Sequence, residues 1–146
     1  MESTAHAQSL AFPVTGISGG RIWTGRIIAG LVTLFLLFDA AIKFARPAAV
    51  LQAFARTGWP AELSVPLGAI LLTCTILYVI PRTAVLGGLL LTGYLGGAVA
   101  ANVRLENPLF SHTLFPVYFG VLIWTSLLLR DPRLVEILPL VRPSGR

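Results

Sequence analysis

Apolar residues in this chain form four long blocks separated by short polar segments. The blocks cover residues 22–45, 63–80, 83–103 and 109–129, and polar positions do not alternate with apolar ones inside them. A helix needs about 20 apolar residues to cross the hydrocarbon core of a bilayer, whereas the strands of a membrane barrel alternate. The pattern predicts an all-α integral membrane four-helix bundle. Its short second span should either thin the bilayer slightly or start earlier, near Pro60.

The segment between the first two blocks has the features of a separate helix. Pro47 cannot continue the first span but suits the start of another helix, and Gly58 provides a C-terminal stop. Between them, residues 48–57 have one apolar side, and Trp59 follows as an aromatic anchor. These features predict a short interfacial helix between spans one and two.

Prolines mark the remaining connections and spans. Residues 81–82 form so short a link that spans two and three must be antiparallel neighbours. Asn107 is expected to cap the fourth helix, with Pro108 at its first position. Pro66 should bend the second span or mark its start. Pro116 should bend the fourth span, because it lacks an amide donor and crowds the carbonyl four residues back.

Composition supports a lipid environment. Hydrophobic residues make up 55% of the chain, charged residues 12%, and the mean hydropathy is +0.82. A soluble domain carries about a quarter charged residues. The net charge of +5 comes from basic residues at the block ends, and these do not form a stripe with interleaved aromatics. This placement argues against nucleic-acid binding and makes the lipid bilayer the main partner.

The tails and the orientation follow from the same pattern. Residues 1–20 carry no Lys or Arg ahead of an apolar core, unlike a secretory signal. We expect a disordered N-terminal tail over 1–20, a transmembrane domain over 21–134 and a C-terminal tail over 135–146. Four spans place both tails on one side, with seven basic residues there (Arg21, Arg26, Arg82, Arg130, Arg133, Arg142 and Arg146) against four on the other. The positive-inside rule predicts a multi-pass protein of the cytoplasmic membrane with cytoplasmic termini.

Small residues follow one side of the third span. Gly93, Gly97 and Ala101 are four apart, and Gly96 and Ala100 lie beside them. Small residues at this spacing are typical of closely packed membrane helices. We therefore interpret them as a packing seam, and a passage or ligand groove is the alternative.

Ionisable residues inside a span are expensive and often functional. Asp39 and Lys43 lie four residues apart on the first span, with Asp39 about 9 Å from its end. One interpretation is an ion pair that fixes the rotation of the helix, and the other is a proton or ligand site. Asn102 and His112 approach the same membrane face from spans three and four. The candidate ligand-binding residues are therefore Asp39, Lys43, Asn102 and His112.

The sequence contains no catalytic or metal-binding motif that we recognise. Cys74 is the one cysteine and lies in an apolar block, and His6 and His112 are the two histidines. There is no spaced histidine pair, no HExxH, no GxSxG, no P-loop and no GxGxxG after a strand. We predict no metal site, no catalytic residue and no cofactor of its own, and a non-catalytic protein is favoured over an enzyme.

Several segments share the pattern of a known family. They are residues 77–104 (LYVIPRTAVLGGLLLTGYLGGAVAANVR), 107–115 (NPLFSHTLF), 129–132 (LRDP), 38–44 (FDAAIKF) and 58–60 (GWP), with Trp124. Over about residues 26–139 the chain resembles the DoxX-like family. The resemblance implies a four-helix bundle in a bacterial-type cytoplasmic membrane. The family takes its name from a subunit associated with thiosulfate:quinone oxidoreduction. Many relatives carry an acid three residues after a glycine in the second helix, and here that position, after Gly68, is Leu71.

Three functions are compatible with these features. The first is a non-catalytic membrane component that binds a lipophilic ligand or a membrane or peripheral partner protein. The second is the membrane subunit of a quinone-linked oxidoreductase complex, which holds a quinone near Asp39, Asn102 and His112 while a partner supplies electrons. The third is a small transporter, although the broken helices and inverted repeat of many such folds are missing.

Overall fold

The computed structural model describes residues 19–131, 133 and 134, and most of these residues are helical. The predicted all-α class is therefore confirmed over the described residues. The tails predicted at 1–20 and 135–146 lie outside them, except that Gly19 and Gly20 begin the first helix. The elements are α1 (Gly19–Ala45), α2 (Ala48–Thr57), η1 (Ala61–Leu63), α3 (Ser64–Val79), α4 (Ala84–Arg104), η2 (Leu109–Thr113) and α5 (Phe115–Arg130).

Four helical segments are long and apolar enough to cross a membrane. They cover Gly19–Ala45, Ala61–Val79, Ala84–Arg104 and Leu109–Arg130. These ranges agree with the four apolar blocks of the sequence. The second span begins at Ala61, which agrees with the early start near Pro60, one of the two alternatives for this span.

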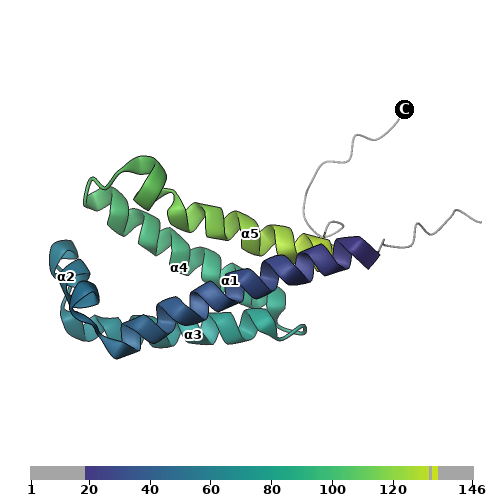
Figure 1. Ribbon diagram of the computed structural model, residues 1–146, viewed down its shortest axis with the longest axis horizontal. Coiled ribbons are helices and arrows are strands. Elements are labelled where there is room, and N and C mark those ends of the chain that lie inside the picture. The colour runs from purple at the N-terminus through teal and green to yellow at the C-terminus, as the bar shows by residue number, and fades with distance from the viewer. Residues whose placement is uncertain (1–18, 132, 135–146) are drawn as a thin grey trace, which may run out of the picture.

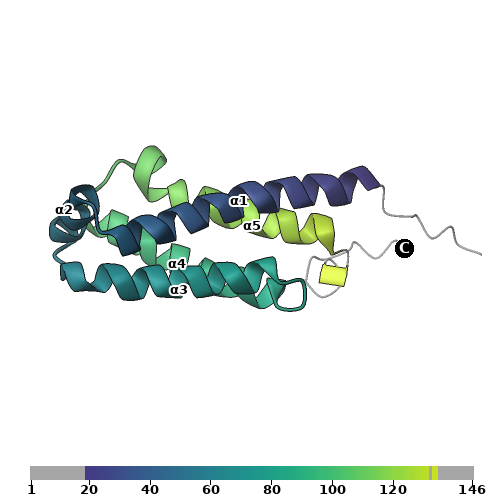
Figure 2. The same cartoon turned by 60° about the horizontal axis from the view of Figure 1, so that its bottom comes forward.

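The four spans form a ring of neighbours. Helix α1 packs against α3 and α5, and α4 packs against the same two helices. Figures 1 and 2 show that the start of α1, the α3–α4 turn and the end of α5 meet at one end of the molecule, here called the terminal end. Helix α2, η2 and the end of α4 lie at the opposite end, here called the loop end.

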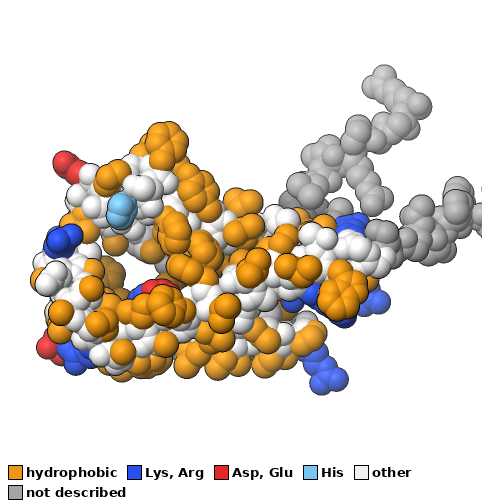
Figure 3. Space-filling model, viewed as in Figure 1, with side chains coloured by type: hydrophobic (Ala, Val, Ile, Leu, Met, Phe, Trp, Pro, Cys, Tyr) orange, Lys and Arg blue, Asp and Glu red, His pale blue; other side chains and the backbone are white. Residues whose placement is uncertain are grey.

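Apolar side chains cover the outside of this ring as well as its interior. Leu31 and Leu34 expose 66% and 68% of their surface, and Leu89 and Val121 expose 58% and 60%. Figure 3 shows such side chains along the length of the helices. Large exposed apolar surfaces are unusual in soluble proteins. The fold is therefore that of a multi-pass membrane protein, with a core formed by Val32, Leu36, Leu71, Tyr78, Leu91 and Ile123.

The short helix predicted after the first span is present as α2. It begins after Pro47 and ends at Gly58, which adopts the left-handed conformation with φ 70°. The amide of Gly58 donates to the carbonyl of Ala55, and the amide of Trp59 donates to that of Phe54. Glycine is favoured here because it has no Cβ to strain this conformation. The location of α2 in the membrane interface remains a prediction.

The fourth span is broken where a bend was expected. Pro116 is the second residue of α5, and a π-helical turn, η2, precedes it. Proline cannot donate to the preceding turn, so the regular helix restarts there. The cap predicted at Asn107 was wrong. Pro108 is extended and precedes the first helical residue, while the Asn107 side chain donates to Asn102 Oδ1 at 2.8 Å.

Helix α4 approaches α3 and α5 closely at the terminal end. A Cβ added to Gly87 would lie 2.2 Å from the backbone nitrogen of Tyr78, and one added to Gly88 would lie 2.7 Å from Leu127 Cδ1. The packing seam predicted further along α4 is not formed by its glycines within the described residues. A Cβ added to Gly93, Gly96 or Gly97 would meet no atom within 4 Å. The reason is that α4 separates from α3 toward the loop end.

Candidate functional site

A cavity of about 430 Å³ lies between the separated helices near the loop end. Its walls come from α1, α4 and the start of α5, and Trp59 and Leu67 also line it. Figure 3 shows the molecule hollowed at this end, with an acidic side chain visible inside. Most lining groups are apolar, and the glycines of α4, Gly93 and Gly97, contribute no side chain to fill it. The absence of side chains at Gly93 and Gly97 therefore leaves part of the cavity unfilled.

Helix α1 places an ion pair in the cavity wall. Lys43 Nζ lies 2.6 Å from Asp39 Oδ1, so the predicted pairing is confirmed. A lysine in a helix directs its side chain back toward the preceding turn, where the residue four positions earlier lies. The side chains of Lys43 and Asp39 are 17% and 37% exposed, and both line the cavity. A neutral pair with remaining donors and acceptors thus faces an apolar space.

Helix α3 supports this pair from outside the cavity. The hydroxyl of Ser64, which is fully buried, donates to the carbonyl of Lys43 at 2.6 Å. Gly68 lies against the same residue, and a Cβ added there would be 3.0 Å from Lys43 Cβ. These contacts fix the height and rotation of the last turns of α1. The ion pair is therefore held in one place by packing as well as by its own charge.

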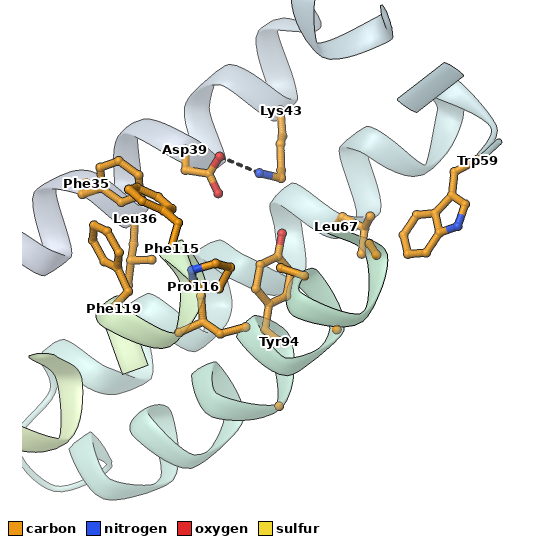
Figure 4. A pocket seen from close by; sticks show the side chains of 15 residues that line it. Phe35, Leu36, Asp39, Lys43, Trp59, Leu67, Tyr94, Phe115, Pro116 and Phe119 are labelled. Carbon is orange, nitrogen blue, oxygen red and sulfur yellow. Dashed lines mark hydrogen bonds and ion pairs between the residues drawn. The ribbon is translucent and has the colours of Figure 1, made fainter. Parts of the chain in front are cut away.

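Tyr94 supplies a third polar group that the sequence analysis missed. It lies on α4 and lines the cavity, and Figure 4 shows its hydroxyl pointing across the space toward the Asp39–Lys43 pair. The sequence does contain a signal for it. Tyr94 precedes Gly97, Ala98 and Ala101 at the spacing of one helix face, and all four line the cavity. The small residues of this face favour a packing seam, but its tyrosine points to a polar function as well.

Three phenylalanines from α1 and α5 form one wall of the cavity. The ring centroids of Phe35 and Phe119 are 4.3 Å apart, and those of Phe115 and Phe119 are 5.0 Å apart. Phe35 and Phe115 meet edge to face at 5.6 Å. The restart of the helix at Pro116, which also lines the cavity, positions Phe115. The aromatic wall gives the cavity a rigid apolar surface on which a flat or extended apolar group can pack.

Two of the four predicted ligand-binding residues lie at the loop end but do not line this cavity. The Asn102 side chain donates to the carbonyl of Ala98 at 2.9 Å and accepts from Asn107, so its amide holds the connection after α4. His112 is exposed, and its Nδ1 lies 2.8 Å from the Ser111 hydroxyl. The sequence thus placed these residues at the correct end of the bundle but did not predict the direction of their side chains.

The described residues give the cavity no metal-binding set. No group of three or more His, Cys, Asp or Glu side chains lies together in the part of the chain that the structure describes. Cys74 is buried in the core and does not line the cavity. The arrangement suits hydrogen bonding to a polar head and apolar contact with the rest of a ligand.

The comparison with protein families agrees with the fold and with the resemblance noted in the sequence. The model of the DoxX-like family matches residues 27–126, which is more than half of the 146 residues. The chain belongs to the DoxX-like family. The match covers the cavity residues from Phe35 to Phe119. No curated protein and no solved structure gave a match. Leu71, three residues after Gly68, is fully buried in the core.

Proposed function

We propose that this DoxX-like protein is a non-catalytic component of the cytoplasmic membrane that binds a lipophilic molecule in the cavity between α1, α4 and α5. The observation that carries the proposal is an apolar cavity of about 430 Å³ with one fixed ion pair in its wall. Ligand sites in proteins are mostly apolar and have a few placed polar groups. The volume lies within the range of about 300–1,000 Å³ that such sites have.

The polar groups define the head of the ligand. Asp39 and Lys43 neutralise each other, so the cavity offers no net charge to an ionic head. Asp39 keeps a second carboxylate oxygen as an acceptor, while Lys43 and Tyr94 carry donors. A neutral head that both accepts and donates hydrogen bonds, such as an alcohol or an amide, matches this set. The aromatic wall then takes the apolar part of the molecule.

A cavity-filling substitution tests this function. Gly93→Leu adds a side chain to the cavity wall, at a position where a Cβ has no neighbour within 4 Å. The probe is a long-chain alcohol that carries a photoreactive diazirine, added to the purified protein in nanodiscs. We expect wild type to be labelled on the cavity residues, as mapped by mass spectrometry. We expect labelling of Gly93→Leu to fall about ten-fold, as it would for a loss of about 1.4 kcal/mol.

Gly96→Leu is the matched control. Gly96 lies on the same helix, and a Cβ there also has no neighbour within 4 Å, but it lines a different groove between α4 and α5. This variant should keep wild-type labelling of the cavity. Equal labelling of the two leucine variants would mean that the probe binds elsewhere, and the cavity would lose its proposed role.

A quinone is the second candidate ligand, and the three phenylalanines favour it. Quinone carbonyls accept hydrogen bonds, which Lys43 and Tyr94 can donate, and the ring can pack on the aromatic wall. The protein would then act as the membrane subunit of a quinone-linked oxidoreductase complex, with electrons supplied by a partner. Competition tests the second candidate. A short-chain quinone should displace the alcohol probe from wild type if the cavity binds quinones, and should leave the labelling unchanged if it does not.

A further inference from the structure

Arginines gather at the terminal end, away from the cavity. Arg21, Arg26, Arg82, Arg130 and Arg133 lie on or beside the helix ends there. The ion pair formed within the described residues is that of Asp39 and Lys43, at the loop end. The positive-inside rule accounts for basic residues at this end, but a topology signal requires only that such residues be present. It does not require that one of them be held in a fixed position inside the bundle.

Arg130 is held in such a position. Its Nε donates to the carbonyl of Ser126 at 3.2 Å, and its guanidinium carbon lies 5.3 Å from the centre of the Tyr78 ring. Tyr78 and Ser126 are fully buried and hydrogen-bonded to each other. Ser126 donates to the carbonyl of Ile123, so Tyr78 is the donor in that bond. Gly25 leaves room for the arginine, because a Cβ there would lie 2.9 Å from Arg130 Cγ.

One nitrogen of this guanidinium has no partner within the described residues. Nη2 of Arg130 is buried and makes no hydrogen bond there. A buried donor without a partner costs about 1–3 kcal/mol, and more when it is charged. Such a group in a native structure requires an explanation, and an unidentified acceptor is one of them. The same acceptor could also bind Nη1 of Arg130 and the guanidinium of Arg26, which lines the same groove.

Arg26 and Arg130 together line a groove of about 380 Å³ beside α1. The groove extends along α1 from Arg26 to Leu37, about 16 Å of helix. Its floor is open at Gly30, where a Cβ would meet nothing within 4 Å. No acidic residue lines it. Arg26 and Arg130 also line a second groove, which includes Asp131. Because the carboxylate of Asp131 would repel an anion, the first groove is the better site for one.

We propose that this groove binds an anionic phospholipid. Its phosphate would lie between Arg26 and Arg130, and an acyl chain would follow the groove past Gly30 to Leu37. Guanidinium groups match phosphate because several N–H donors meet several acceptor oxygens. Anionic lipids attract basic residues at the membrane surface, and here the apolar groove adds a place for the chain. The phosphate position lies at the opposite end from the Asp39–Lys43 pair of the proposed ligand cavity, and the proposal does not depend on that cavity.

Lipid-dependent stability tests the proposal on the full chain. The purified protein, stripped of lipid in detergent, is titrated with phosphatidylglycerol or phosphatidylcholine while thermal unfolding is followed. Wild type should be stabilised by phosphatidylglycerol at lower concentration than by phosphatidylcholine. Arg26→Gln removes one phosphate contact at an exposed position, and should weaken the response to phosphatidylglycerol about five-fold, as expected for one basic residue at a membrane surface.

Three further arms separate this site from general charge attraction. Arg104→Gln removes an exposed arginine at the loop end, and should respond to phosphatidylglycerol as wild type does. Gly30→Leu fills the groove without changing charge, and should also weaken the response, whereas Gly96→Leu should not. Inorganic phosphate alone should give no stabilisation. Equal losses in the Arg26 and Arg104 variants, no loss in Gly30→Leu, or full stabilisation by inorganic phosphate would each overturn the proposal.

Discussion

Asp39 and Lys43 carry opposite charges inside a membrane span, and each depends on the other. Removing Asp39 would leave the ammonium of Lys43, which is 17% exposed, without its partner at 2.6 Å. We expect Asp39→Ala to destabilise the protein by about 1–3 kcal/mol, the cost of an unpaired buried polar group. Asp39→Ala combined with Lys43→Ala should recover much of that loss. Thermal unfolding in detergent of both single variants and the double variant measures the coupling.

The exposed acid Glu62 provides the control for this cycle. Glu62→Ala changes the net charge by the same amount as Asp39→Ala, but Glu62 is exposed and precedes α3. It should change the midpoint of unfolding little, because exposed charges contribute little to stability. If the losses of the two single variants simply add in the double variant, the pair does not stabilise the bundle.

Gly87 is the residue on which the α3–α4 contact depends most directly. A Cβ at this position would lie 2.2 Å from the backbone of Tyr78, which cannot move aside as a flexible side chain can. Gly87→Ala should destabilise the protein by at least about 1–3 kcal/mol, the usual cost of overpacking. Gly96→Ala, made on the open face of the same helix, should be neutral or stabilising by up to about 1 kcal/mol. The midpoints of thermal unfolding of the two variants decide this comparison, and equal midpoints would contradict it.

Local spacing predicted only part of the site at the residue scale. The Asp39–Lys43 pair was predictable because both residues lie on one helix, four positions apart. Tyr94 was missed because its direction toward that pair depends on how α4 is rotated against α1, which no local pattern records. Asn102 and His112 were predicted as ligand-binding residues only from their position along the spans. In the structure, Asn102 hydrogen-bonds to the Ala98 carbonyl and His112 to the Ser111 hydroxyl.

Element boundaries were predictable to within a few residues because bilayer thickness fixes the length of an apolar span. Prolines were less informative. Pro66 lies in the first turn of α3, as one of two alternatives predicted. Pro116 is the second residue of α5, and the disruption before it is a π-helical turn over Leu109–Thr113. A proline in the sequence marks a disruption, and the neighbouring turns decide its form.

The orientation of the elements can be tested with single cysteines. In a Cys74→Ala background, Gln52→Cys places a thiol on α2 at an exposed position, and Arg82→Cys places one in the turn between α3 and α4. Cytoplasmic termini require α2 to lie outside and the turn to lie inside. A membrane-impermeant maleimide should label the α2 thiol in intact cells and the turn thiol only after the cells are opened. The reverse pattern would show that the protein has the opposite orientation.

At the scale of the whole molecule, α4 packs closely on α3 at the terminal end and separates from it toward the loop end, where α1 and α3 stay in contact at Gly68. Gly25, Gly87 and Gly88 bring the helices together at the terminal end, while the open glycines of α4 line the cavity near the loop end. The sequence predicted that glycines would matter, but not which of them would meet a neighbour. That distinction follows from the angle between helices, which is set by all the contacts together. The same asymmetry separates the two proposed sites, one for a neutral head and one for an anion.

We expect the purified chain alone to catalyse no redox reaction. Catalysis requires a nucleophile, a positioned acid and base, a metal or a bound cofactor, and the groups on the cavity wall are an ion pair, a tyrosine hydroxyl and apolar side chains. These groups can orient a quinone, but its reduction needs electrons from another protein. Pure protein mixed with a soluble quinone analogue and common reductants should therefore reduce the quinone only at the background rate. The visible spectrum of the protein should show no absorption band. His112→Ala, away from the cavity on the exposed η2 turn, serves as the control. Turnover above background, and above all turnover that this variant loses, would contradict a non-catalytic role and shift the chemistry to the loop-end surface.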